Sequence, residues 1–285
     1  MKLALVIGKS GQLANELVAT KLSDYQVLAL GRNDIDITDM LSIEKVLAEY
    51  QPSVVINASA YTAVDNAETD SDSAYLVNSE AVANLAQQCK KSGVKFLHVS
   101  TDFVFNGESN KAYLTDDKTD PKGVYGASKL AGEEAIKRIY PEGSAIVRTS
   151  WVYSAFGNNF VKTMLRLMSE KAELGIVTDQ IGCPTYAKGL AEFLWDLVKL
   201  KKCDLIYHWS DAGVASWYDF AVVIQKMALE KGLLNKKIPL KGIPSSAYLT
   251  PAKRPAFSLL DASGSDHIKQ RFHWSEQLEE CLTKL

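Results

Sequence analysis

The sequence has no long hydrophobic run and almost no excess of charge of either sign. No apolar run approaches the roughly 20 residues that a helix needs to cross a bilayer, so a membrane protein is not expected. The apolar run at residues 3–7 is shorter than the core of a secretory signal peptide and carries no small-residue cleavage site. The 32 Lys and Arg residues are balanced by 34 Asp and Glu residues, which argues against a nucleic-acid surface.

Cysteine is also scarce. The chain has four cysteines, widely separated and without a C-x-x-C pair, at Cys89, Cys183, Cys203 and Cys281. This spacing fits neither a zinc site nor a disulfide framework. We therefore expect reduced thiols and a cytoplasmic protein.

What the sequence does contain is a repeated alternation of apolar strands and amphipathic helices. With 285 residues, 47% of them hydrophobic, the chain can bury a large core. Apolar runs predict strands, and helical patterns lie between them, the longest from residue 71 to 91. The expected strands are at residues 3–7, 26–30, 54–56, 95–99 and 145–148. This alternation predicts a Rossmann-type α/β fold with a doubly wound parallel sheet.

A change in composition after residue 150 predicts a second, smaller part of the molecule. We expect residues 1–150 to form an NAD(P)-binding Rossmann domain. Residues 151–285 are expected to form mostly a substrate-binding lobe, with some segments returning to the Rossmann domain. Within this lobe, Ser216 is expected to cap an amphipathic helix.

A glycine-containing turn follows the first strand. Gly8, Gly11 and Ala14 fit the extended dinucleotide fingerprint G-x-x-G-x-x-[GA], in which glycines allow a tight turn and close approach to a pyrophosphate. The second strand is followed by Arg32, with no acid until Asp34. Because an arginine accommodates a 2′-phosphate, we expect NADPH as the cofactor, with NADH as the alternative. A competing interpretation makes Arg32 only a solvated loop residue.

Tyr125 and Lys129 are four residues apart in a predicted helix, so their side chains leave the same face. A positive charge near a phenol favours the phenolate, which makes such a pair a tunable proton donor. An ordinary surface pair has the same spacing. The pair becomes informative beside a dinucleotide turn and Ser100-Thr101-Asp102 at the end of a predicted strand.

These three features together resemble the extended short-chain dehydrogenase/reductase superfamily. Several stretches along nearly the whole chain are similar to motifs of one branch, the dTDP-4-dehydrorhamnose reductases. They are residues 57–68, 100–105, 148–153, 157–167, 179–185, 216–221 and 254–255. The resemblance implies NADPH-dependent reduction of the 4-keto group of dTDP-4-dehydro-L-rhamnose to dTDP-L-rhamnose.

The resemblance also implies roles for particular residues. Tyr125 would give a proton to the reduced ketone, Lys129 would lower the pKa of that tyrosine and hold the nicotinamide ribose, and Thr101 would hydrogen-bond the substrate oxygen. The expected substrate contacts are Thr101, Asp102 and Trp151. The expected cofactor contacts are Gly8, Ser10, Gly11, Gln12, Leu13, Arg32, Asp36, Ile37, Ser59, Ala60, Tyr61, Thr62, Tyr125 and Lys129.

Two departures from related patterns bear on mechanism and metal. Phe103 stands where neighbouring sugar-nucleotide dehydratases carry a glutamate, which disfavours dehydration. Some family members use a glutamate like Glu16 in a Mg²⁺-bridged dimer, but their second metal ligand falls near Lys188, and an ammonium cannot ligate a cation. We therefore expect no such Mg²⁺ site, Glu16 as a solvated residue, and a monomer or homodimer.

Two other functions are possible alternatives to the reductase. One is an epimerase or dehydratase of the superfamily, and the other is a non-catalytic regulatory subunit like that of methionine adenosyltransferase.

Overall fold

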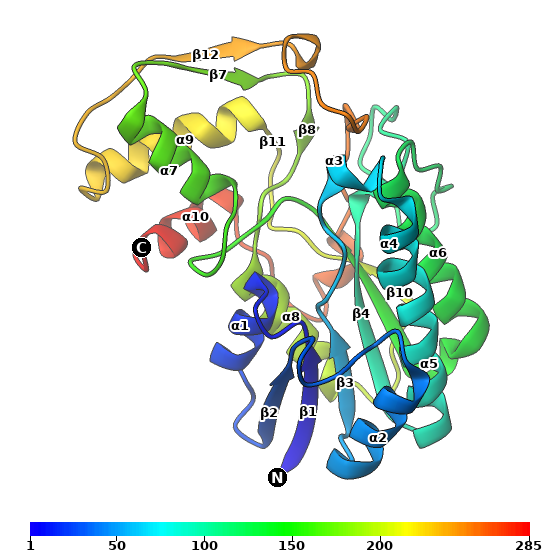
Figure 1. Ribbon diagram of the computed structural model, residues 1–285. Coiled ribbons are helices and arrows are strands. Elements are labelled where there is room, and N and C mark those ends of the chain that lie inside the picture. The colour runs from blue at the N-terminus through cyan, green and yellow to red at the C-terminus, as the bar shows by residue number, and fades with distance from the viewer.

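The computed structural model describes residues 1–285 and is built on a six-stranded sheet (Figure 1). All neighbouring strands are parallel, and their order is β2-β1-β3-β4-β5-β10. The strands are β1 (Lys2–Ile7), β2 (Tyr25–Leu30), β3 (Val54–Asn57), β4 (Lys95–Thr101), β5 (Ser144–Thr149) and β10 (Ile206–His208). The chain reverses its direction of travel across the sheet between β1 and β3, where open α/β sheets bind ligands.

Helices cover both faces of the sheet, because its strands are apolar on both sides. One face carries α2 (Met40–Tyr50), α5 (Ala81–Ser92) and α6 (Val124–Ile139), which share a buried core with the sheet. The other face carries α1 (Gln12–Ala19) and α8 (Ala187–Lys199), packed against each other and the sheet. The predicted Rossmann-type α/β fold is confirmed.

The long helix expected at residues 71–91 is interrupted. The structure has α4 (Ser71–Tyr75), a π-helical segment at Leu76–Glu80 and then α5. Asn78 lies in the π-helical segment with a buried side chain. The predicted helical span is confirmed, but its π-helical segment was not predicted, because the tertiary contacts of Asn78 favour a π-turn that the apolar periodicity does not encode.

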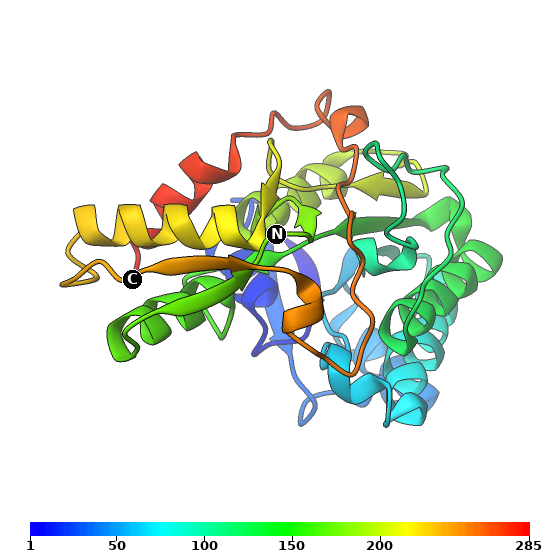
Figure 2. The ribbon, with the colours of Figure 1, turned by 90° about the horizontal axis from the view of Figure 1, so that it is seen from above.

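The lobe lies beside the sheet and has its own core (Figures 1 and 2). It contains α7 (Phe160–Glu170), α9 (Trp217–Glu230) and α10 (Trp274–Leu282). Its short strands pair as β7 (Leu174–Val177) with β12 (Leu240–Ile243), β8 (Ile181–Gly182) with β11 (Ala215–Ser216), and β6 (Val152–Tyr153) with β9 (Thr185–Tyr186). Ser216 caps α9 through a capping box with Asp219, as expected.

The remaining helical pieces are short. They are α3 (Val64–Ala67) and 3-10 turns at Asp102–Val104, Pro141–Gly143, Ser245–Ala247 and Ser263–Ser265. None of the helices combines the length and the apolarity that crossing a bilayer requires. Two elements beyond residue 150, α8 and β10, lie in the layers of the sheet, while the division of the chain at residue 150 stays a prediction.

Candidate functional site

A groove crosses the carboxyl ends of the central strands. It consists of two cavities of about 530 Å³ each, one over the turn between β1 and α1 and one between β4, α6 and the lobe. The two cavities share lining residues from the β1–α1 turn and the segment after β3, which are Ser10, Gly11, Ala58, Ser59, Ala60 and Thr62. A single elongated ligand can therefore reach from the first cavity into the second.

The β1–α1 turn is shaped to let a ligand approach the backbone. Gly8 has a φ of +107°, and a Cβ there would lie 3.0 Å from the carbonyl oxygen of Ala58 and 3.0 Å from the amide of Ser59, so only glycine fits. Gly11 is the N-cap of α1 and supplies no side-chain cap, which leaves free N–H groups at the start of this helix. Such a helix start binds phosphate groups, so this turn fits the pyrophosphate of a dinucleotide.

Most of the residues expected to bind the cofactor line the groove. Those in the first cavity are Gly8, Ser10, Gly11, Arg32, Asp36, Ile37, Ser59, Ala60 and Thr62. Those in the second cavity include Gln12, Leu13, Tyr125 and Lys129. Tyr61 lines neither cavity, and its hydroxyl donates to the Asp70 carboxylate (3.1 Å).

The rim of the first cavity holds an exposed cation. Arg32 lies there, whereas its neighbour Lys9 is paired with Asp34 (Nζ–Oδ2 3.6 Å). Asp36 accepts hydrogen bonds from the amide and the hydroxyl of Thr38 at 2.9 and 2.7 Å, so its carboxylate is already engaged. The charge available to a 2′-phosphate at this rim is therefore positive.

Thr101 and Asp102 lie at the end of β4, in the wall of the second cavity. The Thr101 hydroxyl donates to Oδ1 of Asp102 (3.1 Å) and accepts from the amide of Phe103 (3.2 Å). The second oxygen of Asp102, Oδ2, is buried without a hydrogen-bond partner. Burial raises the pKa of Asp102 to about 6, against hydrogen bonds that lower it. A ligand hydroxyl in this cavity could satisfy that oxygen.

Tyr125 faces the same cavity from the first turn of α6. Burial raises the pKa of its phenol to about 12, with a smaller opposing effect from the Thr101 hydroxyl. The ring of Phe103 meets the Tyr125 ring edge-on, with centroids 5.5 Å apart. Tyr125 therefore keeps its proton at neutral pH and has an apolar neighbour where a dehydratase would carry an acid.

The Lys129 side chain contacts the backbone and a histidine of β4. Its Nζ donates to the Val99 carbonyl oxygen (2.7 Å) and lies 3.2 Å from Nε2 of His98. Burial lowers the pKa of Lys129 to about 8. Burial is the largest influence on the Tyr125 pKa, and the lowering expected from Lys129 stays a prediction.

Two stacked tryptophans connect the sheet domain to the lobe in this cavity. Trp151 follows β5 and stacks on Trp217 at the start of α9, with ring centroids 3.6 Å apart. Trp151 has a φ of +47°, a strained conformation for a residue with a side chain. A Cβ on Gly182 would lie 2.9 Å from the Trp151 indole, so Gly182 makes room for it.

Sequence reasoning missed two residues of the second cavity. Arg254 is its only cation besides Lys129, and it is paired with Asp65 (Nη2–Oδ2 2.7 Å). The second residue that was missed is Trp217. Both lie within stretches that carried the family resemblance, but no charge or spacing in the sequence indicated a role in the site.

A third residue that sequence reasoning left without a role is Asn78, which supports the site from behind. Its Oδ1 accepts from the Tyr61 amide (2.9 Å), and its Nδ2 donates to the Tyr61 carbonyl oxygen (3.1 Å) and to the Ser128 hydroxyl (3.0 Å). Ser128 lies between Tyr125 and Lys129 on α6. Asn78 thus ties the loop after β3 to the helix that carries the proton-transfer pair.

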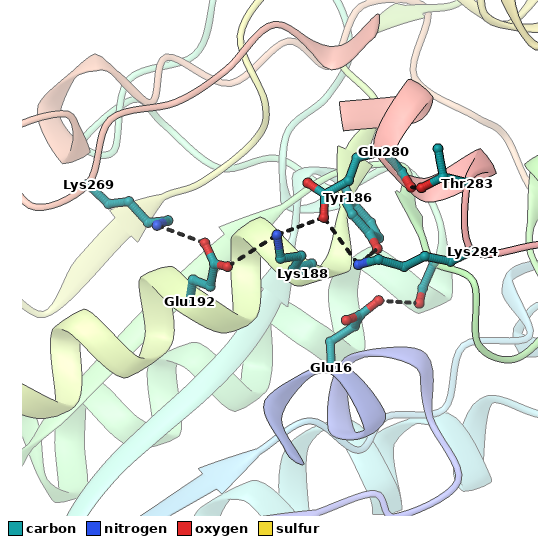
Figure 3. A network of polar contacts seen from close by, with 9 residues as sticks. Glu16, Tyr186, Lys188, Glu192, Lys269, Glu280, Thr283 and Lys284 are labelled. Carbon is teal, nitrogen blue, oxygen red and sulfur yellow. Dashed lines mark hydrogen bonds and ion pairs between the residues drawn. The ribbon is translucent and has the colours of Figure 1, made fainter. Parts of the chain in front are cut away.

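The region that could resemble a Mg²⁺ site contains lysines instead of a ligand cluster. Figure 3 shows Lys188 between Glu192 and Glu280, with Nζ–O distances of 3.6 and 2.7 Å. Lys284 adds a second ammonium 3.1 Å from Glu280. No group of three or more His, Cys, Asp or Glu residues could hold a metal ion. These residues do not fit Mg²⁺, because ammonium groups already neutralise the carboxylates.

Glu16 is buried rather than solvated, so that expectation was wrong. Its side chain on α1 is 2% exposed and accepts a hydrogen bond from the Ser154 hydroxyl (2.7 Å). Glu16 lies near Tyr186 and near Lys284, which follows the end of α10 (Figure 3). The chain after β6 and the C-terminal helix cover this face of α1, which an isolated helix pattern cannot reveal.

Comparisons with known proteins find similarity over the whole chain. The family model described as "RmlD substrate binding domain" matches residues 1–285. The spore coat polysaccharide biosynthesis protein SpsK of Bacillus subtilis (strain 168) is 41% identical, over 99% of this chain and 97% of that protein. The dTDP-4-dehydrorhamnose reductase of Aggregatibacter actinomycetemcomitans is 40% identical, over 94% of this chain and 92% of that protein.

A solved structure is similar over its whole length. The dTDP-4-dehydrorhamnose reductase of Bacillus anthracis str. Ames in complex with NADP has a TM-score of 0.94 and 34% identity, and the match covers 100% of both chains. The sequence identity, the fold and the matched length thus all indicate the same family. The chain belongs to the dTDP-4-dehydrorhamnose reductase family.

Proposed function

We propose that this protein reduces the 4-keto group of dTDP-4-dehydro-L-rhamnose to dTDP-L-rhamnose with NADPH. The observation that carries the proposal is the continuous groove that joins the glycine turn at Gly8 to the cavity of Thr101 and Tyr125. The family membership supports the same reaction. The expected place of action is the cytoplasm.

Tyr125 is the proton donor in this proposal. When bound, the nicotinamide supplies hydride to the ketone carbon, and the carbonyl oxygen then needs a proton. Tyr125 is a protonated phenol at neutral pH because burial raises its pKa to about 12. The Thr101 hydroxyl, once it releases the Asp102 carboxylate, donates its one hydrogen bond to the substrate oxygen where negative charge develops. Lys129 lines the same cavity, where it would hold the cofactor ribose and add a positive charge near the phenol.

The backbone of the β1–α1 turn and the exposed Arg32 at the rim of the first cavity would hold the cofactor. Arg32 supports NADPH over NADH, since its guanidinium can pair with a 2′-phosphate. The residues after β3, Ser59 to Thr62, form the opposite wall of the cradle.

The second cavity suits a nucleotide sugar. The unpartnered Oδ2 of Asp102 can accept a sugar hydroxyl, and the indole of Trp151 offers an apolar wall. Arg254 can exchange the half-buried Asp65 carboxylate for a phosphate, because both are anions that its guanidinium can bind. We assign the sugar to Asp102 and Trp151 and the diphosphate to Arg254.

The alternatives are not favoured. A dehydratase needs a second acid or base beside Thr101, where this chain has Phe103 against the Tyr125 ring. A regulatory subunit needs no proton-transfer set, whereas Thr101, Tyr125 and Lys129 all line one cavity here.

The proposal is tested by measuring NADPH oxidation with dTDP-4-dehydro-L-rhamnose. Tyr125→Phe is expected to lower kcat at least about 100-fold, the range of a lost general acid. Tyr248→Phe is the matched control, because Tyr248 is 62% exposed and lies outside both cavities. Full activity of Tyr125→Phe would remove this residue from the mechanism, and no activity of the wild type would remove the reaction.

A further inference from the structure

A chain of buried polar side chains lies behind Lys129, and the proposed reaction does not use it. Nε2 of His98 is 3.2 Å from Nζ of Lys129, and Nδ1 of His98 is 3.1 Å from Nδ2 of Asn57. Oδ1 of Asn57 accepts from the amide (3.1 Å) and the hydroxyl (2.6 Å) of Ser59. His98 and Asn57 are fully buried, whereas Ser59 lines both cavities.

The hydrogen-bond donors fix the orientation of this chain. The backbone N–H of Ser59 can only donate, so the Asn57 atom that faces it must be the oxygen. The Asn57 NH₂ group then faces His98 and donates to Nδ1. Nδ1 therefore carries a lone pair, and the single proton of a neutral imidazole lies on Nε2, pointing at Lys129.

This arrangement depends on the charge of Lys129. An Nε2–H group can donate to a neutral amine, but it repels an ammonium. If Lys129 is charged, Nε2 must accept, Nδ1 must carry the proton, and Asn57 must turn its oxygen toward His98. The turned amide can no longer accept from Ser59, so Ser59 needs another partner, which a ligand in the groove can supply.

The surrounding charges allow both the amine and the ammonium form of Lys129. Burial holds the pKa of His98 well below its usual value, with the Lys129 charge as a smaller cause, so the imidazole stays neutral. Burial lowers the pKa of Lys129 to about 8, while Glu133, one turn along α6, raises it. The Glu133 carboxylate is itself bound by Arg148, with Nε–O distances of 3.0 and 3.2 Å. Tyr125, the other titratable group on this face of α6, stays neutral.

We propose that His98 and Asn57 are positioning residues that couple the charge of Lys129 to the contacts of Ser59 in the cofactor cavity. A ligand that engages Ser59 releases Asn57 and so favours the ammonium form of Lys129. A ligand-free groove favours the amine. The proposal deepens the proposed function through Lys129, but the coupling itself is a property of the protein without substrate.

The direct test is the tautomer of His98, read by ¹⁵N NMR of the protein labelled at its four histidines. His98→Gln assigns the signal. As the pH rises through the pKa of Lys129, near 8, the proton of His98 is expected to move from Nδ1 to Nε2. A single tautomer throughout that range overturns the proposal, whether or not the protein reduces a keto sugar.

A second variant tests the role of Asn57. Asn57→Asp removes the N–H donor, so Nδ1 of His98 keeps its proton and the ammonium form of Lys129 is favoured up to a higher pH. The alkaline decline of kcat for NADPH oxidation is then expected to move up by at least about half a pH unit. Asn235→Asp, which adds the same charge at an exposed position of the lobe, is expected to leave the decline in place. Equal profiles of the two variants contradict the coupling, and if Asn57→Asp does not fold, the wild-type titration decides alone.

Discussion

At the scale of single residues, the chemistry depends on what burial does to each titratable group. The family resemblance predicted that Thr101, Tyr125 and Lys129 belong to one site, and they do line one cavity. It was not enough to predict the direction of the Tyr125 pKa, because that depends on burial and on where the Lys129 ammonium points. The burial of Glu16 and the pairing of Arg254 could not be predicted for a similar reason, since their partners come from distant segments.

The first prediction concerns the pH dependence of the wild type. The pKa of Lys129 is lowered to about 8, so its charge is present below that pH and is lost as the pH rises through it. Tyr125 stays protonated across this range. We expect kcat to be constant near pH 7 and to fall above about pH 8, as measured by NADPH oxidation at saturating substrate. A rate that holds constant to pH 10 would show that the Lys129 charge does not matter.

The second prediction concerns the cofactor. Arg32→Ala removes the exposed guanidinium at the rim of the first cavity, so KM for NADPH is expected to rise about tenfold, a loss of about 1.4 kcal/mol. KM for NADH should change little. Arg138→Ala, at an exposed position of α6 outside the groove, is the control. An unchanged ratio of the two KM values would make Arg32 an ordinary loop residue.

At the scale of elements, the site depends on how α6 approaches the π-helical segment at Leu76–Glu80. The strands and most helices follow from apolar periodicity, so the sequence predicts them to within a few residues. The π-turn does not follow, because one extra residue per turn leaves composition and pattern almost unchanged. It is specified by tertiary contacts, since Asn78 bonds to Tyr61 and Ser128.

The third prediction tests whether the site needs the close contact between α6 and the π-helical segment. A Cβ on Gly132 would overlap the carbonyl oxygen of Asn78, so Gly132→Ala must push α6 away from the π-turn. We expect a loss of about 1–3 kcal/mol in the free energy of unfolding and a lower kcat, because Tyr125 and Lys129 move with α6. Denaturant unfolding and activity assays measure the two effects.

The matched control for this change is Gly264→Ala, where no atom lies within 4 Å of the added Cβ. That variant should keep the stability and the activity of the wild type. If Gly132→Ala behaves like Gly264→Ala, close contact between α6 and the π-turn is not needed for the site.

At the scale of the whole molecule, the lobe is joined to the sheet domain by buried polar contacts and by ion pairs. Ser154 bonds to Glu16, and the Asn159 amide donates to Gln12 (2.9 Å). The sequence predicts that segments return to the sheet, but not which face they cover. The positions of these returning segments are determined by the packing of α8 on α1 and by the pairing of β10 with β5.

The fourth prediction is that metal ions do not affect this assembly. Lys188 and Lys284 already neutralise Glu280, so EDTA and millimolar Mg²⁺ should leave Tm and the oligomeric state unchanged. Thermal unfolding and size-exclusion chromatography measure both. Lys188→Glu removes the cation between Glu192 and Glu280, and we expect a lower Tm that Mg²⁺ partly restores. A wild-type Tm that falls in EDTA would contradict this interpretation of the lysines.

The central claim is hydride transfer to the keto carbon of a nucleotide sugar in the groove between Gly8 and Tyr125. The most direct measurement uses NADPH carrying deuterium at the transferred position and locates the label in the product by NMR. We predict one deuterium at C4 of the sugar for each NADPH oxidised. A sugar product without deuterium, or conversion of the sugar without net consumption of NADPH, would contradict the proposed reaction.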